Sequence, residues 1–279
     1  MTAMQAAKLA KKFLGDPILF AKYHWPSMRF YSKQVEMLRS VRDNVETFVH
    51  AGHKLGKDRA SAVAVLWFFM TRRPARVIIC GSSTESIRDT LWGEIENLIR
   101  EAERNGRPFN VKVNHLRLEK RIFGKPNETE PLDYVEAKTV KRGEALHGHH
   151  LDDSEGPRLM FVFSEATAIE DEHYDAAQTQ MHRLLVCANP MKTDGFFYRV
   201  CRAGNVMHPL KNGTKLINVI HIDGERDSPN VVFGKRWVAA GRKGDPPRVI
   251  PGVLSYTDYL IRQSWPEAMR RVRLHGRFL

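Results

Sequence analysis

Cysteine, long apolar runs and acidic residues are all scarce in this sequence of 279 residues. The three cysteines, Cys80, Cys187 and Cys201, match neither a zinc-binding spacing nor a disulfide framework. Cys80 and Cys187 each end an apolar run, where a thiol usually packs as a small buried hydrophobe. We therefore expect free thiols and a reducing cytoplasm.

The apolar runs are too short to cross a membrane. The longest, from Ala60 to Met70, has about half of the ~20 residues that a bilayer-spanning helix needs. The N-terminus carries Lys8, Lys11 and Lys12 but lacks a long apolar segment followed by small residues, so we expect no secretion signal. These absences favour neither a membrane protein nor a secreted one.

Basic residues outnumber acidic ones, 44 against 32, which gives a formal net charge of +12. This excess suits a polyanionic partner, because each nucleic-acid phosphate that a protein neutralises releases counterions. A basic but otherwise ordinary surface is the alternative. Hydrophobic residues make up 42% of the chain, enough for a folded core. The length fits one α/β domain with a smaller appendage.

Apolar stretches of strand length alternate with helical patterns over most of the chain. We expect strands over 47–50, 76–80, 159–163, 183–187 and 215–221, and helices over 32–41, from 58 to about 70, over 85–103 and over 174–180, after an amphipathic opening over 4–19. Strands that are apolar throughout are typical of a mainly parallel sheet covered by helices on both faces. Residues 105–150 indicate a polar, irregular insertion that bears a hairpin.

The pattern changes near residue 223. A loop is expected over 241–247, and one or two short helices over 256–271. We interpret residues 1–222 as the domain with the sheet and residues 223–279 as a small linker or lid. Ligands of such sheets bind beyond the carboxyl ends of the strands, where the motifs below fall.

A phosphate-binding loop is indicated between the first strand and its helix. It consists of Gly52, His53, Lys54, Leu55, Gly56, Lys57 and Asp58. Backbone N–H groups of such a turn hold phosphates, and Lys57 would reach the β- and γ-phosphates. The usual pattern is G-x-x-x-x-G-K-[ST], but Ala51 replaces its first glycine and Asp58 its hydroxyl residue. A Gly-Lys pair also occurs by chance; the strand–loop–helix context favours the phosphate loop.

An apolar strand that ends in acidic residues usually completes such a site. Residues 160–166 have this form, with Ser164 in place of the aspartate and Glu165 as the candidate general base. The two departures from the usual motifs form a pair. Asp58 would bring the carboxylate and Ser164 the hydroxyl to Mg²⁺, which tolerates ligands held through water. The alternative is that both changes disable hydrolysis.

In their order along the chain, these motifs resemble those of a bacteriophage large terminase, the motor that pumps DNA into a phage capsid. The resemblance covers most of the chain and includes 81–84, 91–95, 144–150, 187–190, 195–198 and 271–278. It implies that Tyr31 and Gln34 contact the adenine of ATP and that Lys54 is the basic residue often found inside the loop. It also implies that Asn189 senses the γ-phosphate.

The family uses an arginine finger from a neighbouring subunit. Arg142 lies in a plausible region, whereas His147 stands where some members place that arginine. The implied partners are double-stranded DNA, the portal protein and the small terminase subunit. The assembled motor would be a homo-oligomeric ring in the host cytoplasm, whereas the isolated chain would be a monomer. Residues 271–278 resemble the junction to a nuclease domain, and we expect no nuclease activity from this chain.

The sequence thus predicts an α/β P-loop NTPase of the ASCE type that uses ATP and Mg²⁺ to translocate double-stranded DNA into a procapsid. One alternative is a helicase-like DNA-translocating ATPase on the same fold. The other is a degenerate P-loop module that binds nucleotide and nucleic acid without turnover. His147, His149 and His150 lack a second ligand cluster, so we do not interpret them as a metal site. The basic residues over 270–277 would contact DNA phosphates or form a charged helix face.

Overall fold

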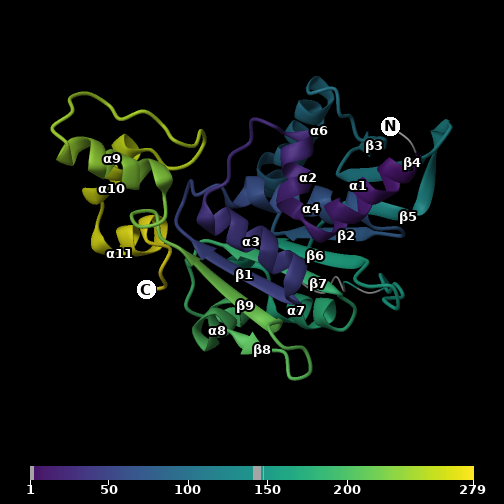
Figure 1. Cartoon of the computed structure of the whole chain (residues 1–279). Helices are drawn as coiled ribbons and strands as arrows, with labels where there is room; N and C mark the ends of the chain where they lie inside the picture. The colour runs from purple at the N-terminus through teal and green to yellow at the C-terminus, as the bar shows by residue number, and fades with distance from the viewer. Residues whose placement is uncertain (1–2, 141–145, 147) are drawn as a thin grey trace.

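The computed structural model describes residues 3–140, 146 and 148–279, which form one sheet with helices on both faces (Figure 1). Within these residues the strands pair in the order β3-β4-β5-β2-β6-β7-β1-β9-β8. The strands are β1 (Glu46–Ala51), β2 (Arg76–Gly81), β3 (Val111–Asn114), β4 (Arg117–Ile122), β5 (Lys125–Thr139), β6 (Leu159–Ser164), β7 (Arg183–Ala188), β8 (Val206–Met207) and β9 (Lys215–Ile222).

The helices alternate with the strands along much of the chain. They are α1 (Ala3–Gly15), α2 (Pro17–His24), α3 (Ser32–Asp43), α4 (Lys57–Thr71), α5 (Thr84–Ile87), η1 (Arg88–Trp92), α6 (Gly93–Arg104), η2 (Ala166–Ala168), α7 (Asp171–Gln178), α8 (Gly195–Ala203), α9 (Pro229–Ala239), α10 (Tyr256–Gln263), α11 (Glu267–Met269) and η3 (Arg270–Leu274). None of the helices in the described residues is long and apolar enough to cross a bilayer.

The central strands run parallel, which determines where ligands can bind. β5, β2, β6, β7, β1 and β9 pair in parallel, whereas β3, β4 and β8 add antiparallel edges. Cys187 lies level with both Ser164 and Val49, and Ala51 lies level with Ile222. The carboxyl ends of β6, β7, β1 and β9 therefore meet at one edge, where ligands of open α/β sheets bind.

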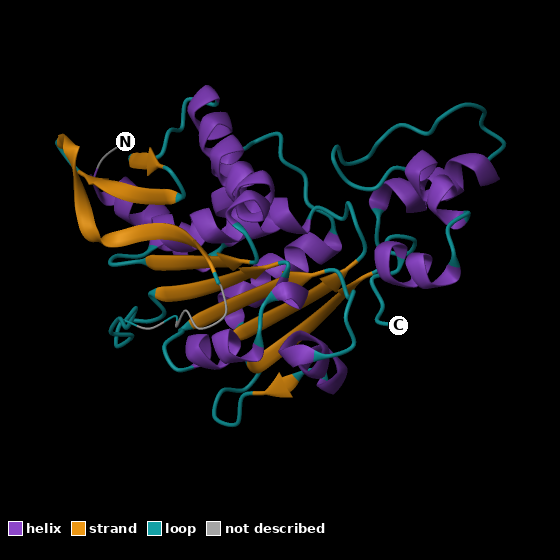
Figure 2. Cartoon of the chain, turned by 180° about the vertical axis from the view of Figure 1, so that it is seen from behind, coloured by secondary structure: helices purple, strands orange, loops and turns teal. Residues whose placement is uncertain are grey.

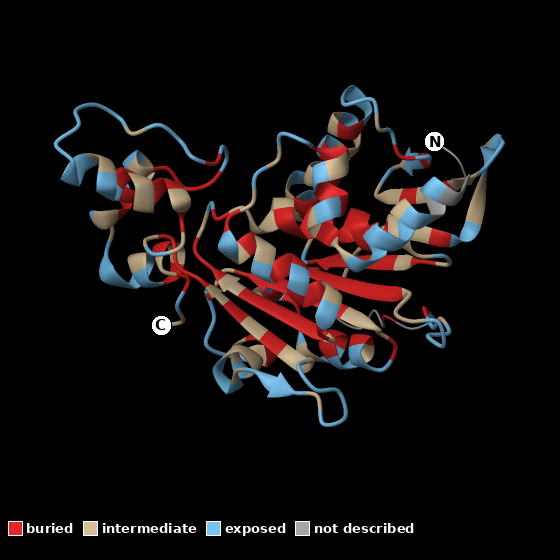
Figure 3. Ribbon diagram, viewed as in Figure 1, coloured by how far each residue is buried: buried red, intermediate tan, exposed pale blue. Residues whose placement is uncertain are grey.

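Helices cover both faces of the sheet because alternate strand residues belong to two apolar clusters (Figure 2). Val49 and Leu185 pack with α1, α2, α3, α4 and α6, whereas Phe48 and Leu184 pack with α7 and α8. α4 is buried from residue 60 to residue 69, as expected for a helix that is apolar on all sides. Figure 3 shows the buried strands at the centre. Each large apolar side chain buried there contributes about 1.5–3 kcal/mol to folding.

The main sheet contains a strand beside β2, the second half of β5, that the sequence did not predict. Residues 105–150 contain the expected hairpin, formed by β4 and β5, but the second half of β5 also pairs with β2 inside the main sheet. Val135 and Ala137 are buried there, whereas Glu136 and Lys138 are half-buried. This alternation lacks the continuous apolar run that marks the other strands, so the sequence did not predict a sheet strand here.

Several helices also differ from the prediction. Asp16 and Pro17 divide the opening segment in two, because the Asp16 carboxylate accepts two backbone N–H groups of the next turn and opens α2. The predicted helix over 85–103 is divided by the π-helical turn η1. α9 is a helix that the sequence did not predict. Gly234 in its centre lowers the helix propensity of that segment.

Residues 223–279, here called the C-terminal region, lie beyond the carboxyl edge of the sheet. Figure 1 shows α9, α10 and α11 as a separate group at the end of β9. Val253, Leu254 and Leu274 are buried and belong to the same apolar cluster as α4. The region therefore packs onto the edge at which the predicted phosphate loop lies.

Candidate nucleotide-binding site

The turn between β1 and α4 has a tightly constrained backbone. Lys54 and Gly56 both adopt left-handed conformations, with φ angles of 60° and 69°. Glycine suits the second position, since a Cβ there would lie 2.6 Å from the Gln34 Nε2 atom. Lys54 holds the same conformation at a cost of about 1–2 kcal/mol. Such strained residues gather at ligand-binding sites, where the surrounding structure enforces them.

The amides that open α4 are free to bind a ligand. Within the described part of the chain, no protein acceptor takes the backbone N–H groups of Gly56, Lys57 and Asp58. The Ala60 amide, further along the helix, donates to the Gly56 carbonyl oxygen at 3.2 Å. Unpaired amides and the positive end of the helix dipole together favour an anion such as phosphate.

Asn189 contacts both ends of this loop. It follows β7, and its Nδ2 atom donates to the Ala51 carbonyl oxygen at 2.6 Å. Its Oδ1 atom accepts a hydrogen bond from the Lys57 ammonium at 3.4 Å. The structure thus brings together Lys57 and Asn189, which are far apart in the sequence, and holds the ammonium at the carboxyl edge of the sheet.

Ser164 and Glu165 lie at the end of β6, on the same edge. Ser164 is buried and lies level with Cys187 of β7. Glu165 is exposed, has a φ angle of 55°, and accepts a hydrogen bond from the Ser86 hydroxyl at 2.6 Å. The carboxylate is therefore held by the segment that follows β2.

Cys187, near the end of β7, is a buried thiol that contacts α4. Burial raises the pKa of Cys187 to about 12, and the negative charge of Asp58 acts in the same direction. Ser164 is the neighbour of Cys187 in the sheet, and the Ser61 Oγ atom of α4 lies 3.5 Å from its Sγ atom. The two residues that depart from the usual motifs, Asp58 in the first turn of α4 and Ser164 at the end of β6, therefore both lie at the carboxyl edge of the sheet.

His53 is neutral although it lies in a basic loop. Burial is the main cause, followed by the charges of Lys57 and Arg273, and together they lower the pKa of His53 to about 4. Its Nε2 atom is buried without a hydrogen-bond partner among the residues described. At neutral pH the loop carries the charges of Lys54 and Lys57 but none from His53.

The start of α3 packs against the loop with the two residues expected at the adenine. The Tyr31 hydroxyl donates to the Leu55 carbonyl oxygen at 2.7 Å, and Gln34 Nε2 donates to the Gly56 carbonyl oxygen at 3.0 Å. Burial raises the pKa of Tyr31 above its ordinary value, so its hydroxyl remains a donor. The Gln34 Oε1 atom is buried and has no partner in the described chain. Tyr31 thus braces the loop, whereas Gln34 keeps an unused acceptor.

The C-terminal region holds the loop from the other side, which the sequence did not predict. Leu254 N donates to the Lys54 carbonyl oxygen at 2.7 Å, and His53 N donates to the Arg273 carbonyl oxygen at 2.8 Å. Arg262, a buried residue, donates to the His53 carbonyl oxygen at 3.1 Å. Hydrogen bonds between main-chain groups leave no pattern in a sequence. The only residue of this contact that a sequence pattern could have indicated is Arg262, which lies with Tyr259 on the buried face of α10.

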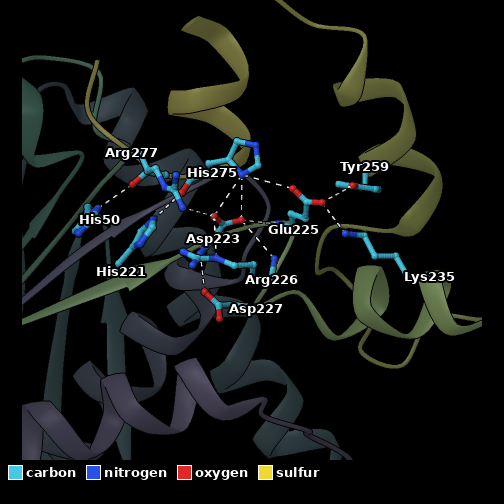
Figure 4. A network of polar contacts seen from close by, with 11 residues as sticks. His50, His221, Asp223, Glu225, Arg226, Asp227, Lys235, Tyr259, His275 and Arg277 are labelled. Carbon is cyan, nitrogen blue, oxygen red and sulfur yellow. Dashed lines mark hydrogen bonds and ion pairs between the residues drawn. The ribbon is translucent and has the colours of Figure 1, made fainter. Parts of the chain in front are cut away.

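Asp223, just after β9, contacts the segment formed by residues 273–277, near the end of the chain (Figure 4). Its buried carboxylate lies 3.2 Å from His275 Nδ1 and 3.7 Å from Arg277. His50 and His221 stack with ring centroids 4.6 Å apart, and each contacts a main-chain oxygen of the same segment. Burial lowers the pKa of His50 to about 4, so its contact is uncharged at neutral pH.

Position 52 must be glycine because the main chain of residues 273 and 274 lies very close to it. A Cβ at Gly52 would lie 2.3 Å from the Leu274 carbonyl oxygen and 3.1 Å from that of Arg273. Because both are main-chain atoms, we expect Gly52→Ala to lower the free energy of unfolding by about 1–3 kcal/mol, measured by thermal or urea unfolding. Gly15→Ala is the control, since its Cβ meets nothing within 4 Å. Equal stability of the two variants would contradict this packing.

A cavity of about 760 Å³ opens beside the loop. Gln34, Gly56 and Asp58 line it at the loop, and Phe30 and residues 249–253 line it further out. Its volume is within the range of small-molecule sites. The end of β6 does not line it. The cavity therefore adjoins the start of α4 at Gly56 and Asp58, whereas neither Lys57 nor Glu165 lines it.

Arg142, the candidate arginine finger, and His147, its alternative, both lie outside the described residues. His149 is buried next to β5, where its ring contacts the Tyr134 hydroxyl at 3.3 Å. Among the described residues, no group of three or more His, Cys, Asp or Glu side chains has the arrangement of a metal site.

Scanned against protein-family models and curated proteins, the sequence matches none. Solved structures do match. The large terminase ATPase domain of Thermus phage P74-26 aligns over 92% of this chain and 97% of its own, with a TM-score of 0.60 and 15% identity. This chain has the fold of a large terminase ATPase domain.

Other terminases share this fold over part of their length. A large terminase from a thermophilic bacteriophage aligns over 90% of this chain with a TM-score of 0.57 and 14% identity, and that of bacteriophage HK97 over 90% with 0.55 and 13%. The chain spans 54% and 51% of those two proteins, about half of each. The predicted α/β fold, with a mainly parallel central sheet flanked by helices, is therefore confirmed.

Proposed function

We propose that this chain is the ATP-hydrolysing motor domain of a large terminase, which translocates double-stranded DNA into a procapsid. The observation that carries the proposal is the loop before α4, where Lys57 meets Asn189 beside three amides without protein acceptors in the described chain. Its occurrence in the terminase ATPase fold supports the proposal. So does the large terminase of a thermophilic bacteriophage, solved in complex with ADP, which aligns over 77% of this chain with a TM-score of 0.52.

The loop binds the phosphates and the adjoining cavity takes the nucleoside. Amides of Gly56, Lys57 and Asp58 donate to phosphate oxygens, and the Lys57 ammonium reaches the β- and γ-phosphates. The rest of the loop, from Gly52 to Leu55, provides the turn and the charge of Lys54. In the cavity, the unused Gln34 Oε1 acceptor suits the exocyclic amine of adenine.

Asp58 and Ser164 fit a magnesium ion. Both offer oxygen donors, the ligand type that Mg²⁺ requires, and both lie at the carboxyl edge, at the start of α4 and at the end of β6. When bound, Mg²⁺ neutralises charge on the β- and γ-phosphates. Glu165 then orients a water molecule and accepts its proton as the oxygen attacks the γ-phosphorus, and the bond to the bridging oxygen breaks to give ADP and phosphate.

The exchanged pair predicts a coupling between Asp58 and Ser164. Asp58→Thr alone leaves two hydroxyls at the metal and Ser164→Asp alone leaves two carboxylates, so each should lower kcat for ATP hydrolysis. The double variant restores one of each and should be about tenfold more active than either single variant. Steady-state phosphate release measures all four proteins. A double variant no better than the singles would show that the two positions do not form an exchanged pair.

Coupling to DNA follows from the remaining groups. The Asn189 side chain accepts a hydrogen bond from Lys57, which would bind the γ-phosphate. When the γ-phosphate leaves, the hydrogen bonds of the Asn189 amide change, and this change would move the part of the motor that holds DNA. Arg142 is the proposed finger supplied to a neighbouring subunit, which requires a homo-oligomeric ring. The portal protein and the small terminase subunit are the proposed protein partners, in the host cytoplasm. Residues 1–222 would form the motor domain and residues 223–279 its lid.

A translocation assay separates this function from its two rivals. With ATP, Mg²⁺ and a duplex that carries a triplex-forming strand, a packaging motor should displace the third strand and leave the duplex intact. A helicase-like ATPase should separate the duplex instead. A degenerate module should bind ATP and DNA and do neither. Either of the last two results, obtained with the full assembled motor, would contradict the proposal.

A further inference from the structure

Residues 249–253 form a wall of the cavity without any regular secondary structure. They follow an exposed loop and precede α10, and all five of them line the cavity. A segment of this kind has no ladder of its own to fix its shape, so other groups must supply its hydrogen bonds. The source of these bonds decides how well the wall is formed before a ligand arrives.

The side chain of Asn230 makes four hydrogen bonds to the main chain of this segment. Asn230, buried in the first turn of α9, accepts the backbone N–H groups of Val249 and Ile250 through Oδ1, at 2.7 and 2.9 Å. Its Nδ2 atom donates to the carbonyl oxygens of Ile250 and Val253, at 2.9 and 3.0 Å. The amide thus uses all four of its hydrogen-bonding positions on this one segment.

The wall also joins the phosphate loop directly. Leu254 N donates to the Lys54 carbonyl oxygen at 2.7 Å, and Ser228 Oγ donates to the Leu254 carbonyl oxygen at 2.9 Å. A Cβ at Gly56 would lie 3.6 Å from the Val253 Cγ2 atom, which is ordinary packing distance. The segment that Asn230 holds therefore adjoins the phosphate loop at Lys54 and Gly56 and lines the cavity beside it.

We propose that Asn230 is a positioning residue for nucleoside recognition: it fixes residues 249–253 against the base and ribose of a bound nucleotide. The inference rests on the proposed function of the site and adds to it the part of the C-terminal region that selects the ligand. Asn230 acts through the wall and does not touch the phosphates. It stabilises the bound form by removing the need to order this segment on binding.

The test compares a nucleotide with a ligand that has phosphates alone. Calorimetric titration with ATP and with inorganic tripolyphosphate, both with Mg²⁺, is carried out on the wild type and Asn230→Ala. We expect the variant to bind ATP about tenfold more weakly and to bind tripolyphosphate as the wild type does. Equal loss for both ligands indicates a general structural role and overturns the inference, as does no loss for either.

A matched control lies in the same region. Thr257 is exposed, donates to the Asp245 carboxylate at 3.2 Å and does not line the cavity. Thr257→Val should leave both affinities unchanged. If it weakens ATP binding as much as Asn230→Ala does, the effect belongs to the region as a whole and the inference fails.

A second measurement uses the wild-type chain and so does not depend on the folding of the variant. ATP should slow hydrogen–deuterium exchange of the Gly252 and Val253 amides, which Asn230 does not bind and which a bound nucleoside would cover, whereas tripolyphosphate should leave their exchange unchanged. Unchanged exchange with bound ATP overturns the inference while the proposed function stands. If the wild type binds neither ligand, the proposed function itself fails.

Discussion

Glu165→Gln is expected to lower kcat for ATP hydrolysis by about 10²–10⁴-fold, the contribution typical of a general base. The amide keeps the size of the side chain and can still accept the hydrogen bond that Ser86 donates to the carboxylate at 2.6 Å. It cannot accept a proton from water. Because Glu165 does not line the cavity beside the loop, ATP affinity should change little.

The control for this variant is Glu85→Gln. Glu85 is exposed on α5, next in sequence to Ser86, and lies outside the cavity lining. Its replacement removes the same charge from the same neighbourhood and should leave kcat unchanged. Single-turnover phosphate release with enzyme in excess measures both variants. Near-normal turnover of Glu165→Gln would remove this residue from the catalytic step.

Lys57→Ala is expected to weaken ATP binding about 10- to 100-fold, because hydrogen bonds to charged groups are each worth about 1.5–3 kcal/mol. The ammonium donates to Asn189 Oδ1 at 3.4 Å, which holds it at the carboxyl edge of the sheet. Its loss leaves the amides that open α4 as phosphate donors but removes the positive charge. Equilibrium titration with a fluorescent ATP analogue measures the change.

Lys22→Ala serves as the control for charge alone. Lys22 is exposed in the last turn of α2, which contributes no residue to the phosphate loop. Its replacement lowers the net charge by the same amount and should leave the dissociation constant for ATP unchanged. Equal affinities of Lys57→Ala and the wild type would show that phosphates do not bind at this loop.

The central sheet could be predicted from the sequence because its strands are buried on both faces. Stretches such as 159–163 and 183–187 are largely apolar, and each is followed by polar residues at the carboxyl edge. The loop from Gly52 to Asp58 was found in the same way, by its place between a strand and a helix. The contact between Lys57 and Asn189 then follows from the parallel pairing of β1 with β7.

The rest could not be predicted because its determinants are main-chain contacts or alternating patterns. The second half of β5 alternates buried and half-buried residues, so it lacks the apolar run of a central strand. The bonds from Leu254 and to Arg273 join backbone to backbone. Gly52 looks like part of a phosphate motif in the sequence, and only the structure shows that the Leu274 carbonyl oxygen requires it.

Phosphate release from ATP, measured with Mg²⁺ at rising concentrations of duplex DNA, tests the central claim most directly. If the chain is an ATP-driven DNA motor, the rate of phosphate release by the wild type should rise with DNA concentration and then saturate. ATP bound without phosphate release at any DNA concentration would contradict the claim and identify a nucleotide-binding module without turnover.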